Sequence, residues 1–177
     1  MTTATAFLSG HRVAERLEAA LPGAVEEATD GWVRIVPARL LDVCGFLRDD
    51  GDLDAKFLAL LSGVDWYDYF EVVYQLASLT RNHRFALKVR LDDHESPEVP
   101  SVSSVWQGAD LQEREAYDLM GIRFGGHPDL KRLFLWDGFP GHPLRKDFMT
   151  LPGGFKPGLQ RFPKEDAEAW GGEARVP

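Results

Sequence analysis

Cysteine is nearly absent from this sequence, because Cys44 is the only one among 177 residues. A single thiol forms no internal disulfide bond, and an iron–sulfur cluster needs four ligands. The sequence therefore predicts a chain that holds no cluster of its own. We expect Cys44, which lies in a predicted helix, to be a small apolar side chain of the core.

Long apolar runs are missing as well, and no stretch approaches the roughly 20 residues that a membrane-spanning helix needs. The N-terminus has no basic segment followed by an apolar run, so we expect no signal peptide and a cytosolic chain. The net charge of −8 argues against nucleic acid as the main partner. Phosphate-binding loops, dinucleotide fingerprints and nucleophile elbows are also absent from the sequence.

What is present is the pattern of an α+β domain, with 44% apolar residues to form a core. Strict alternation of apolar and polar residues over 70–77 and 85–91 predicts an antiparallel pair with one buried face. Between these strands His83 is expected to be exposed in a turn, and 92–100 is expected to be a loop. The other predicted elements are a helix over 13–21, a hairpin of 25–28 with 32–36, a helix over 37–49, a strand over 57–64, a helical turn over 101–106 and a helix over 110–120.

The last of these helices has a polar side and an apolar side. Asp110 is the expected N-cap, and Glu113 follows at the spacing of a capping box. Arg114, Glu115 and Asp118 are expected on the polar side, with Arg114 and Asp118 forming an ion pair four residues apart. The sequence thus predicts that this polar side faces solvent.

Glu113 is the exception, because its position falls within the apolar arc of the same helix. A buried carboxylate needs a cation or hydrogen-bond donors, or it takes up a proton. One hypothesis pairs it with the downstream cations (Lys131, Arg132, Arg145 and Lys146). The other leaves it in the first turn, facing the positive end of the helix.

Residues 121–177, called the C-terminal arm below, differ from the globular domain predicted over 1–120. The arm is too rich in glycine and proline for packed helices or central strands. It nevertheless carries many large apolar residues and, over 127–164, more Lys and Arg than Asp. One interpretation is an extended arm that docks on a partner. The alternative is that it folds back and completes the local core.

Two Gly-His-Pro units, at 126–128 and 141–143, form rigid corners that aim an imidazole and the cations after it. Metal binding by the two histidines with Asp129, Asp147 or Glu113 is an alternative. No short ligand spacing such as H-x₃-H supports it. A stand-alone metal-dependent hydrolase built on Glu113, Asp118 and His127 is the corresponding hypothesis for an enzyme.

An ordered set of motifs resembles one family. The motif ERE-x-x-D-L at 113–119 is followed by G-I-x-F-x-G-H-P-D-L-K-R at 121–132 and by GHPLRKDF at 141–148. This series resembles the 30-kDa subunit of respiratory complex I, which is also known as the C subunit of NADH–quinone oxidoreductase. The resemblance covers most of residues 57–148. It marks the following signature residues: Glu113, Arg114, Glu115, Asp118, His127, Asp129, Arg132, His142, Arg145, Lys146 and Asp147.

The resemblance implies a cofactor-free structural subunit in the hydrophilic arm of a proton-translocating NADH–quinone oxidoreductase. FMN, the iron–sulfur clusters and quinone would belong to other subunits. It implies a peripheral position on the cytoplasmic side of the membrane, with two main partners. These are the 49-kDa (D-type) subunit and the quinone-proximal, cluster-bearing (B-type) subunit. No residue is implied to be catalytic, and the signature residues are expected to form a polar network that fixes the arm.

Related subunits in F420H2 dehydrogenases, the photosynthetic NDH complex and energy-converting hydrogenases are an alternative that keeps the same fold. The closeness of the GHPLRKD match favours the respiratory NADH type.

Overall fold

The computed structural model describes residues 4–148, which form a mixed sheet packed with helices, so the predicted α+β class is confirmed. The second part of the arm, 149–177, lies outside the described residues. The elements are β1 (Ala6–Phe7), α1 (Gly10–Ala20), β2 (Val25–Ala28), β3 (Val33–Ile35), the 3₁₀ turn η1 (Pro37–Arg39), α2 (Leu40–Asp49), β4 (Phe57–Asp65), β5 (Phe70–Ser78), β6 (His83–Leu91), β7 (Glu98–Pro100), α3 (Ala109–Met120) and β8 (Arg123–Gly125). Within 4–148 no helix has the length and apolar character that a membrane crossing requires.

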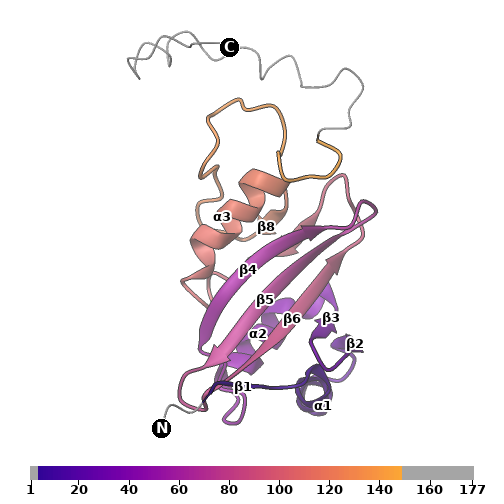
Figure 1. Cartoon of the computed structure of the whole chain (residues 1–177), viewed down its shortest axis with the longest axis vertical. Coiled ribbons are helices and arrows are strands. Elements are labelled where there is room, and N and C mark those ends of the chain that lie inside the picture. Colours follow the sequence, from indigo (N-terminus) through magenta and orange to yellow (C-terminus); the bar gives the residue numbers. More distant parts are fainter. Residues whose placement is uncertain (1–3, 149–177) are drawn as a thin grey trace.

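The main sheet has the strand order β2-β3-β6-β5-β4, with β1 added in parallel to β6. Its centre is the predicted antiparallel pair, in which Tyr74 of β5 lies opposite Leu87 of β6. The predicted hairpin is also confirmed as β2 and β3. β3 then pairs in parallel with β6. This order leaves one long edge, along β4, at the end of the sheet (Figure 1).

Helices α1 and α2 cover one face of this sheet. Ser9 caps α1 by accepting a hydrogen bond from the Arg12 N–H at 3.3 Å. Gly10 begins the helix where a Cβ atom would lie 2.0 Å from the Trp32 carbonyl oxygen, so only glycine permits this close approach. Apolar residues at helical spacing are buried against the strands. The fully buried helix residues include Val13, Leu17, Leu40, Val43, Cys44 and Leu47, and on the strands Tyr74 and Leu87 are fully buried.

Helix α3 lies beside β4, and the arm begins directly after it (Figure 1). Gly121 ends the helix with a φ of 77°, as the sequence indicates. Gly63 of β4 lets the helix approach, since a Cβ atom there would be 2.7 Å from the Met120 sulfur. Beyond the helix, β8 pairs in parallel with β7 and forms a second, two-stranded sheet.

Three local predictions are wrong. The segment 92–100 is not a loop throughout, because Glu98–Pro100 forms β7 through pairing with a strand that lies after α3. His83 is buried, since its Nε2 lies 2.8 Å from the Leu53 carbonyl oxygen. Asp110 is not the N-cap, because α3 begins one residue earlier and the capping position, Gly108, has no side chain to donate or accept.

Candidate functional site

The carboxylate of Asp118, fully buried on α3, organises the described part of the arm. Its Oδ2 accepts the backbone N–H groups of three consecutive residues, Leu133, Phe134 and Leu135, at 3.0, 2.7 and 2.9 Å. Its Oδ1 accepts a bond from Arg132 Nη1 at 3.0 Å. Burial acts to raise the pKa of Asp118, but these donors outweigh it and hold the pKa below its usual value. The carboxylate is therefore a charged anchor, not a proton donor.

Arg132 and Arg114 extend this anchor to the carbonyl groups of the arm. Arg132 also donates to the carbonyl oxygens of Phe139 and Gly141, at 3.2 and 3.4 Å. Arg114 does not pair with Asp118 on an exposed helix face, so that prediction is wrong. It donates instead to the carbonyl oxygens of Lys131 and Arg132, both at 3.2 Å. On the side of α3 that was expected to face solvent, the arm covers Asp118 and contacts Arg114, whereas Glu115 stays exposed.

Glu113 is fully buried, and the structure gives it hydrogen-bond donors in place of a lysine or arginine. The Ser101 hydroxyl donates to one oxygen at 2.6 Å, and the Val102 N–H donates to the other at 2.7 Å. His127 Nε2 lies 3.9 Å away. The burial of Glu113 is therefore confirmed. Its partners are Ser101 and Val102, and neither a downstream cation nor the start of α3, so both hypotheses named the wrong partner. Burial raises the pKa of Glu113, and the bonds from Ser101 and Val102 oppose this only in part.

The two Gly-His-Pro corners place their imidazole rings against α3. Gly126 and Gly141 have φ values of 82° and 95°, which favour glycine. His127 Nε2 lies 3.2 Å from the Asp110 carbonyl oxygen, and its Nδ1 accepts the Asp129 N–H at 3.0 Å.

The second corner binds a different carbonyl. His142 uses its other nitrogen, Nδ1, which lies 2.9 Å from the Asp118 carbonyl oxygen. Burial lowers the pKa of His142, and the nearby Arg132 and Arg145 add to the effect.

The last described turn of the arm contacts the end of the main sheet at which β4 finishes and β5 begins. Asp65, at the end of β4, accepts the Lys146 N–H at 2.8 Å and lies 3.1 Å from His94 Nε2. Arg145 donates to the His94 carbonyl oxygen and stacks over the Phe70 ring at 5.1 Å. A weak ion pair of 3.8 Å joins Arg145 to Asp147. Asp65 and His94 were missed in the sequence, where neither belongs to a motif.

Other signature residues stay near the surface. Asp129 forms an exposed ion pair with Lys131 at 2.7 Å. Glu115 is exposed, and the Lys146 ammonium lies 4.5 Å from the centre of the Tyr67 ring. The structure thus gives nine of the eleven signature residues side-chain hydrogen bonds or ion pairs within the domain and arm. The side chains of Glu115 and Lys146 instead border a groove.

No group of three or more His, Cys, Asp and Glu side chains suited to a metal ion occurs within residues 4–148. The hydrolase hypothesis needs Glu113, Asp118 and His127 together. The structure brings Glu113 near His127, but Asp118 pairs with Arg132 instead. The Asp118 carboxylate accepts four hydrogen bonds from the chain, and the Glu113 carboxylate accepts one on each oxygen. These hydrogen bonds and ion pairs hold α3, the sheet and the arm together.

Comparison with known proteins decides the family. A sequence model of the family described as respiratory-chain NADH dehydrogenase, 30 Kd subunit, matches residues 33–152. This chain belongs to that family. The C subunit of NADH-quinone oxidoreductase from Roseiflexus sp. (strain RS-1) is 47% identical over 147 residues, which cover 79% of this chain and 84% of the relative. The C 2 subunit of the same enzyme from Rhizobium etli (strain CIAT 652) is 46% identical, with coverage of 74% and 70%.

The 30-kDa subunit fold also occurs in a solved complex of another kind. A chain from the membrane-bound sulfane sulfur reductase, described as an archaeal respiratory membrane complex, matches with a TM-score of 0.63. The match covers 95% of each chain at 18% sequence identity, so it supports the fold alone. The chain is thus a complex I family member, and its relatives are subunits of an oxidoreductase.

Proposed function

We propose that this chain is a cofactor-free structural subunit in the hydrophilic arm of a proton-translocating NADH–quinone oxidoreductase. Electrons would pass from NADH through FMN and iron–sulfur clusters on other subunits to quinone. This chain would take no part in the chemistry. It would sit peripherally on the cytoplasmic side of the membrane, held there by the complex.

The observation that carries the proposal is how the signature residues are used. Asp118 uses its carboxylate to bind three backbone N–H groups and Arg132. Glu113 uses its own to bind Ser101 and Val102. A residue with such saturated hydrogen bonding is suited to holding a shape, because a catalytic group must keep an atom open to substrate. The family membership then supplies the assembly in which that shape is needed.

Two partners are proposed, the 49-kDa (D-type) subunit and the cluster-bearing (B-type) subunit that faces quinone. Both follow from the family resemblance. The described part of the arm supports docking in a general way, because exposed apolar side chains remain on it, including Phe134 and Leu144 at 64% and 57% exposure.

Capture of the tagged chain from native membranes, followed by mass spectrometry, tests the proposal. We expect the complete set of NADH–quinone oxidoreductase subunits and NADH-dependent quinone reduction in the captured material. An Arg145→Ala, Lys146→Ala variant should capture less of the complex, because Arg145 fixes the arm to the sheet. An Arg12→Ala, Arg84→Ala variant, which changes two exposed cations elsewhere, is the matched control. Capture of no other subunit by the wild-type chain would contradict the proposal.

The equivalent subunit of an F420H2 dehydrogenase, an NDH complex or an energy-converting hydrogenase is the second candidate. The fold match with the sulfane sulfur reductase chain is the reason to retain this second candidate, because the same architecture occurs in another respiratory complex. The 47% identity with an NADH-quinone oxidoreductase subunit favours the first candidate. The same capture separates them, since the subunits that bind the electron donor differ between these complexes.

A further inference from the structure

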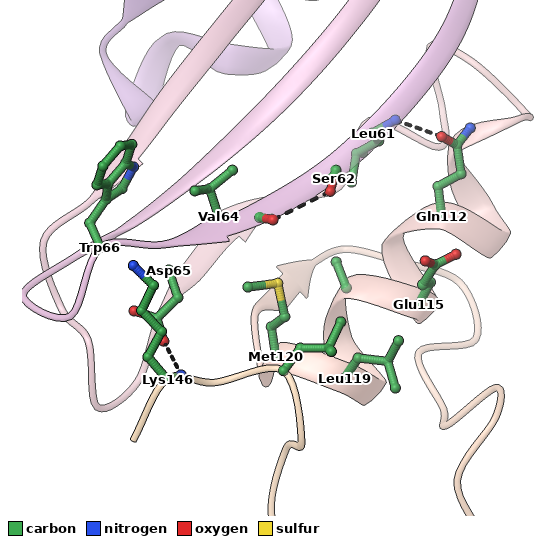
Figure 2. Close-up of a pocket in the computed structure, with 13 residues that line it drawn as sticks. Leu61, Ser62, Val64, Asp65, Trp66, Gln112, Glu115, Leu119, Met120 and Lys146 are labelled. Atoms are coloured by element: carbon green, nitrogen blue, oxygen red, sulfur yellow. Dashed lines mark hydrogen bonds between the residues drawn. The ribbon is translucent and has the colours of Figure 1, made fainter. Parts of the chain in front are cut away.

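A groove of about 370 Å³ runs between the free edge of β4 and helix α3 (Figure 2). One wall is β4 from Leu61 to Asp65 with Trp66 just after it, and apolar side chains such as Leu119 and Met120 of α3 form the other. Leu144 and Lys146 of the arm also line it. The hydrogen bonds and ion pairs that hold the arm to the domain leave this groove open.

The backbone of β4 presents hydrogen-bonding groups to the groove. The Leu61 N–H points away from β5, since it donates to Gln112 Oε1 at 2.5 Å (Figure 2). At the far end, Trp66 donates to the Tyr69 carbonyl and so faces β5. Because an antiparallel strand alternates, the backbones of Gly63 and Asp65 point outward like that of Leu61. Gln112 covers one end of this row, and the Ser62 hydroxyl donates a long bond of 3.3 Å to the Gly63 carbonyl, which a further strand would replace.

The two signature residues left outside the internal network stand at opposite ends of the groove. Glu115 lies near the Gln112 end, and Lys146 lies near Asp65 and Trp66 (Figure 2). Within residues 4–148 neither side chain has an ion pair, and the Lys146 ammonium instead rests on the Tyr67 and Trp66 rings at 4.5 and 5.7 Å. The groove therefore has an exposed carboxylate at one end, an apolar middle and an exposed ammonium at the other end. The buried Asp65 carboxylate beside this ammonium accepts the Lys146 and Tyr67 N–H groups.

Exposed apolar side chains also occur on β4 and directly after it, although Leu60 lines a separate hollow with Gln75 and Arg84. Phe57 and Leu60 of β4 are 49% and 48% exposed, and Trp66 and Tyr67, which follow the strand, are 47% and 63% exposed. An open sheet edge rich in apolar residues invites pairing with another chain and is normally covered. Such a row beside an edge strand is typical of surfaces that bind an extended segment by strand addition.

We propose that this groove binds an extended segment of another subunit, which adds to the sheet as a strand beside β4. The segment carries a cationic side chain at the Glu115 end, an apolar side chain over Met120, and an anionic group at the Lys146 end. The five residues from Leu61 to Asp65 offer about 16 Å of edge at roughly 3.3 Å per residue. The inference rests on the proposed function, because it requires neighbouring subunits.

Two other occupants fit less well. Residues 149–177 follow soon after Lys146 in the sequence, but their first residues include Pro152, Gly153 and Gly154, residue types that disfavour a paired strand. A second copy of this chain could not offer its own β4 edge freely, because its α3 lies beside that edge. A free segment of opposite charge pattern meets neither obstacle.

Photo-crosslinking in the purified complex tests the proposal. A Leu144→p-benzoylphenylalanine variant places the probe at the groove, and a Leu79→p-benzoylphenylalanine variant is the control, since Leu79 is 80% exposed but lies away from the groove. We expect the first to crosslink to a defined segment of another subunit with an acidic and a basic residue near the crosslink. Crosslinks to residues 149–177, to a second copy or to nothing would overturn the proposal.

The retention of charge-changing variants during a salt wash gives a second readout in the same complex. Glu115→Arg and Leu144→Asp should each lower retention of this chain in the complex about tenfold in a salt wash, the effect of losing one interface hot spot. Glu15→Arg and Leu79→Asp change an exposed glutamate on α1 and an exposed leucine elsewhere, and should match the wild type. If the wild-type chain enters the complex but the groove variants are retained equally, only this inference fails. If the wild-type chain enters no complex, the proposed function fails first.

Discussion

Asp118 and Arg132 join helix α3 to the arm through an ion pair of 3.0 Å between a fully buried carboxylate and a guanidinium that is 21% exposed. Asp118 also accepts three successive N–H groups from the chain just after Arg132. One side chain thus fixes the direction in which the arm leaves the domain. The geometry explains why an irregular, glycine-rich segment has a defined path without regular secondary structure.

Replacing Asp118 with Asn should loosen this path. The amide keeps the volume, but it removes the charge and turns its NH₂ group toward a donor. We expect a loss of about 2–4 kcal/mol in the free energy of unfolding, the usual cost of leaving buried donors and a cation unpaired. Urea unfolding of the purified chain measures it. Asp129→Asn, in the exposed pair with Lys131, should change the free energy by less than about 1 kcal/mol, and an equal loss in both variants would contradict the assignment.

Glu113 should make stability depend on pH. Burial raises its pKa in the folded chain, so the folded state binds a proton more readily than the unfolded state. The contribution of Glu113 is therefore fully present below the ordinary pKa of about 4.3 and is lost as pH rises through the raised folded pKa. Glu113→Gln should flatten this part of the stability profile while keeping an acceptor for the Val102 N–H.

Urea unfolding between pH 4 and 8 measures the slope for the wild type and the Gln variant. Glu115→Gln removes an exposed carboxylate two residues away on the same helix, and it should leave the wild-type slope unchanged. A Glu113→Gln profile that parallels the wild type would show that this carboxylate titrates as it does in the unfolded chain.

The strands were the part of the fold that local sequence predicts best. In β5 and β6 the partners are neighbours along the chain, and one face of each is buried, so alternation alone reveals both strands. Strand β7 has no such signal, because its partner β8 lies beyond α3. Gly108 likewise gives no sign that the helix begins before Asp110.

The contacts of the signature residues could not be predicted from the sequence. Asp118 looks solvent-facing on a helical wheel, because the wheel represents α3 alone and omits the arm that covers it. Asp65 binds the Lys146 N–H across 81 positions of sequence, and no local pattern reports such a distance. Motif resemblance marks both sides of the Asp118–Arg132 contact, whereas only the fold reveals Asp65 and His94.

The two Gly-His-Pro histidines should carry different tautomers. The Asp129 N–H is a donor, so His127 Nδ1 must accept, and the ring hydrogen of neutral His127 lies on Nε2. The Asp118 carbonyl is an acceptor, so neutral His142 must place its hydrogen on Nδ1. Long-range ¹H–¹⁵N NMR spectra at neutral pH distinguish these forms by their nitrogen shifts. Identical tautomers at both positions would contradict one of the two contacts.

Two glycine-to-alanine changes should shift stability in opposite directions. Gly45 lies inside α2 with no atom within 4 Å of an added Cβ, so Gly45→Ala should stabilise the chain by about 1 kcal/mol through helix propensity. Gly63→Ala should destabilise it by about 1–3 kcal/mol, because the new methyl group meets the Met120 sulfur at 2.7 Å and Ile122 Cδ1 at 2.8 Å.

The cause of the Gly63 effect can be isolated with a double-mutant cycle. Met120→Ala removes the sulfur that an alanine at position 63 would meet, so the two changes together should cost less than the sum of their separate losses. Thermal or urea unfolding of the four proteins gives the coupling energy. The Gly45→Ala, Met120→Ala pair should be additive, because a methyl group at position 45 meets no atom within 4 Å. Additive losses for Gly63→Ala and Met120→Ala would mean that α3 does not rest on β4 at this glycine, and the groove beside it would then have a different shape.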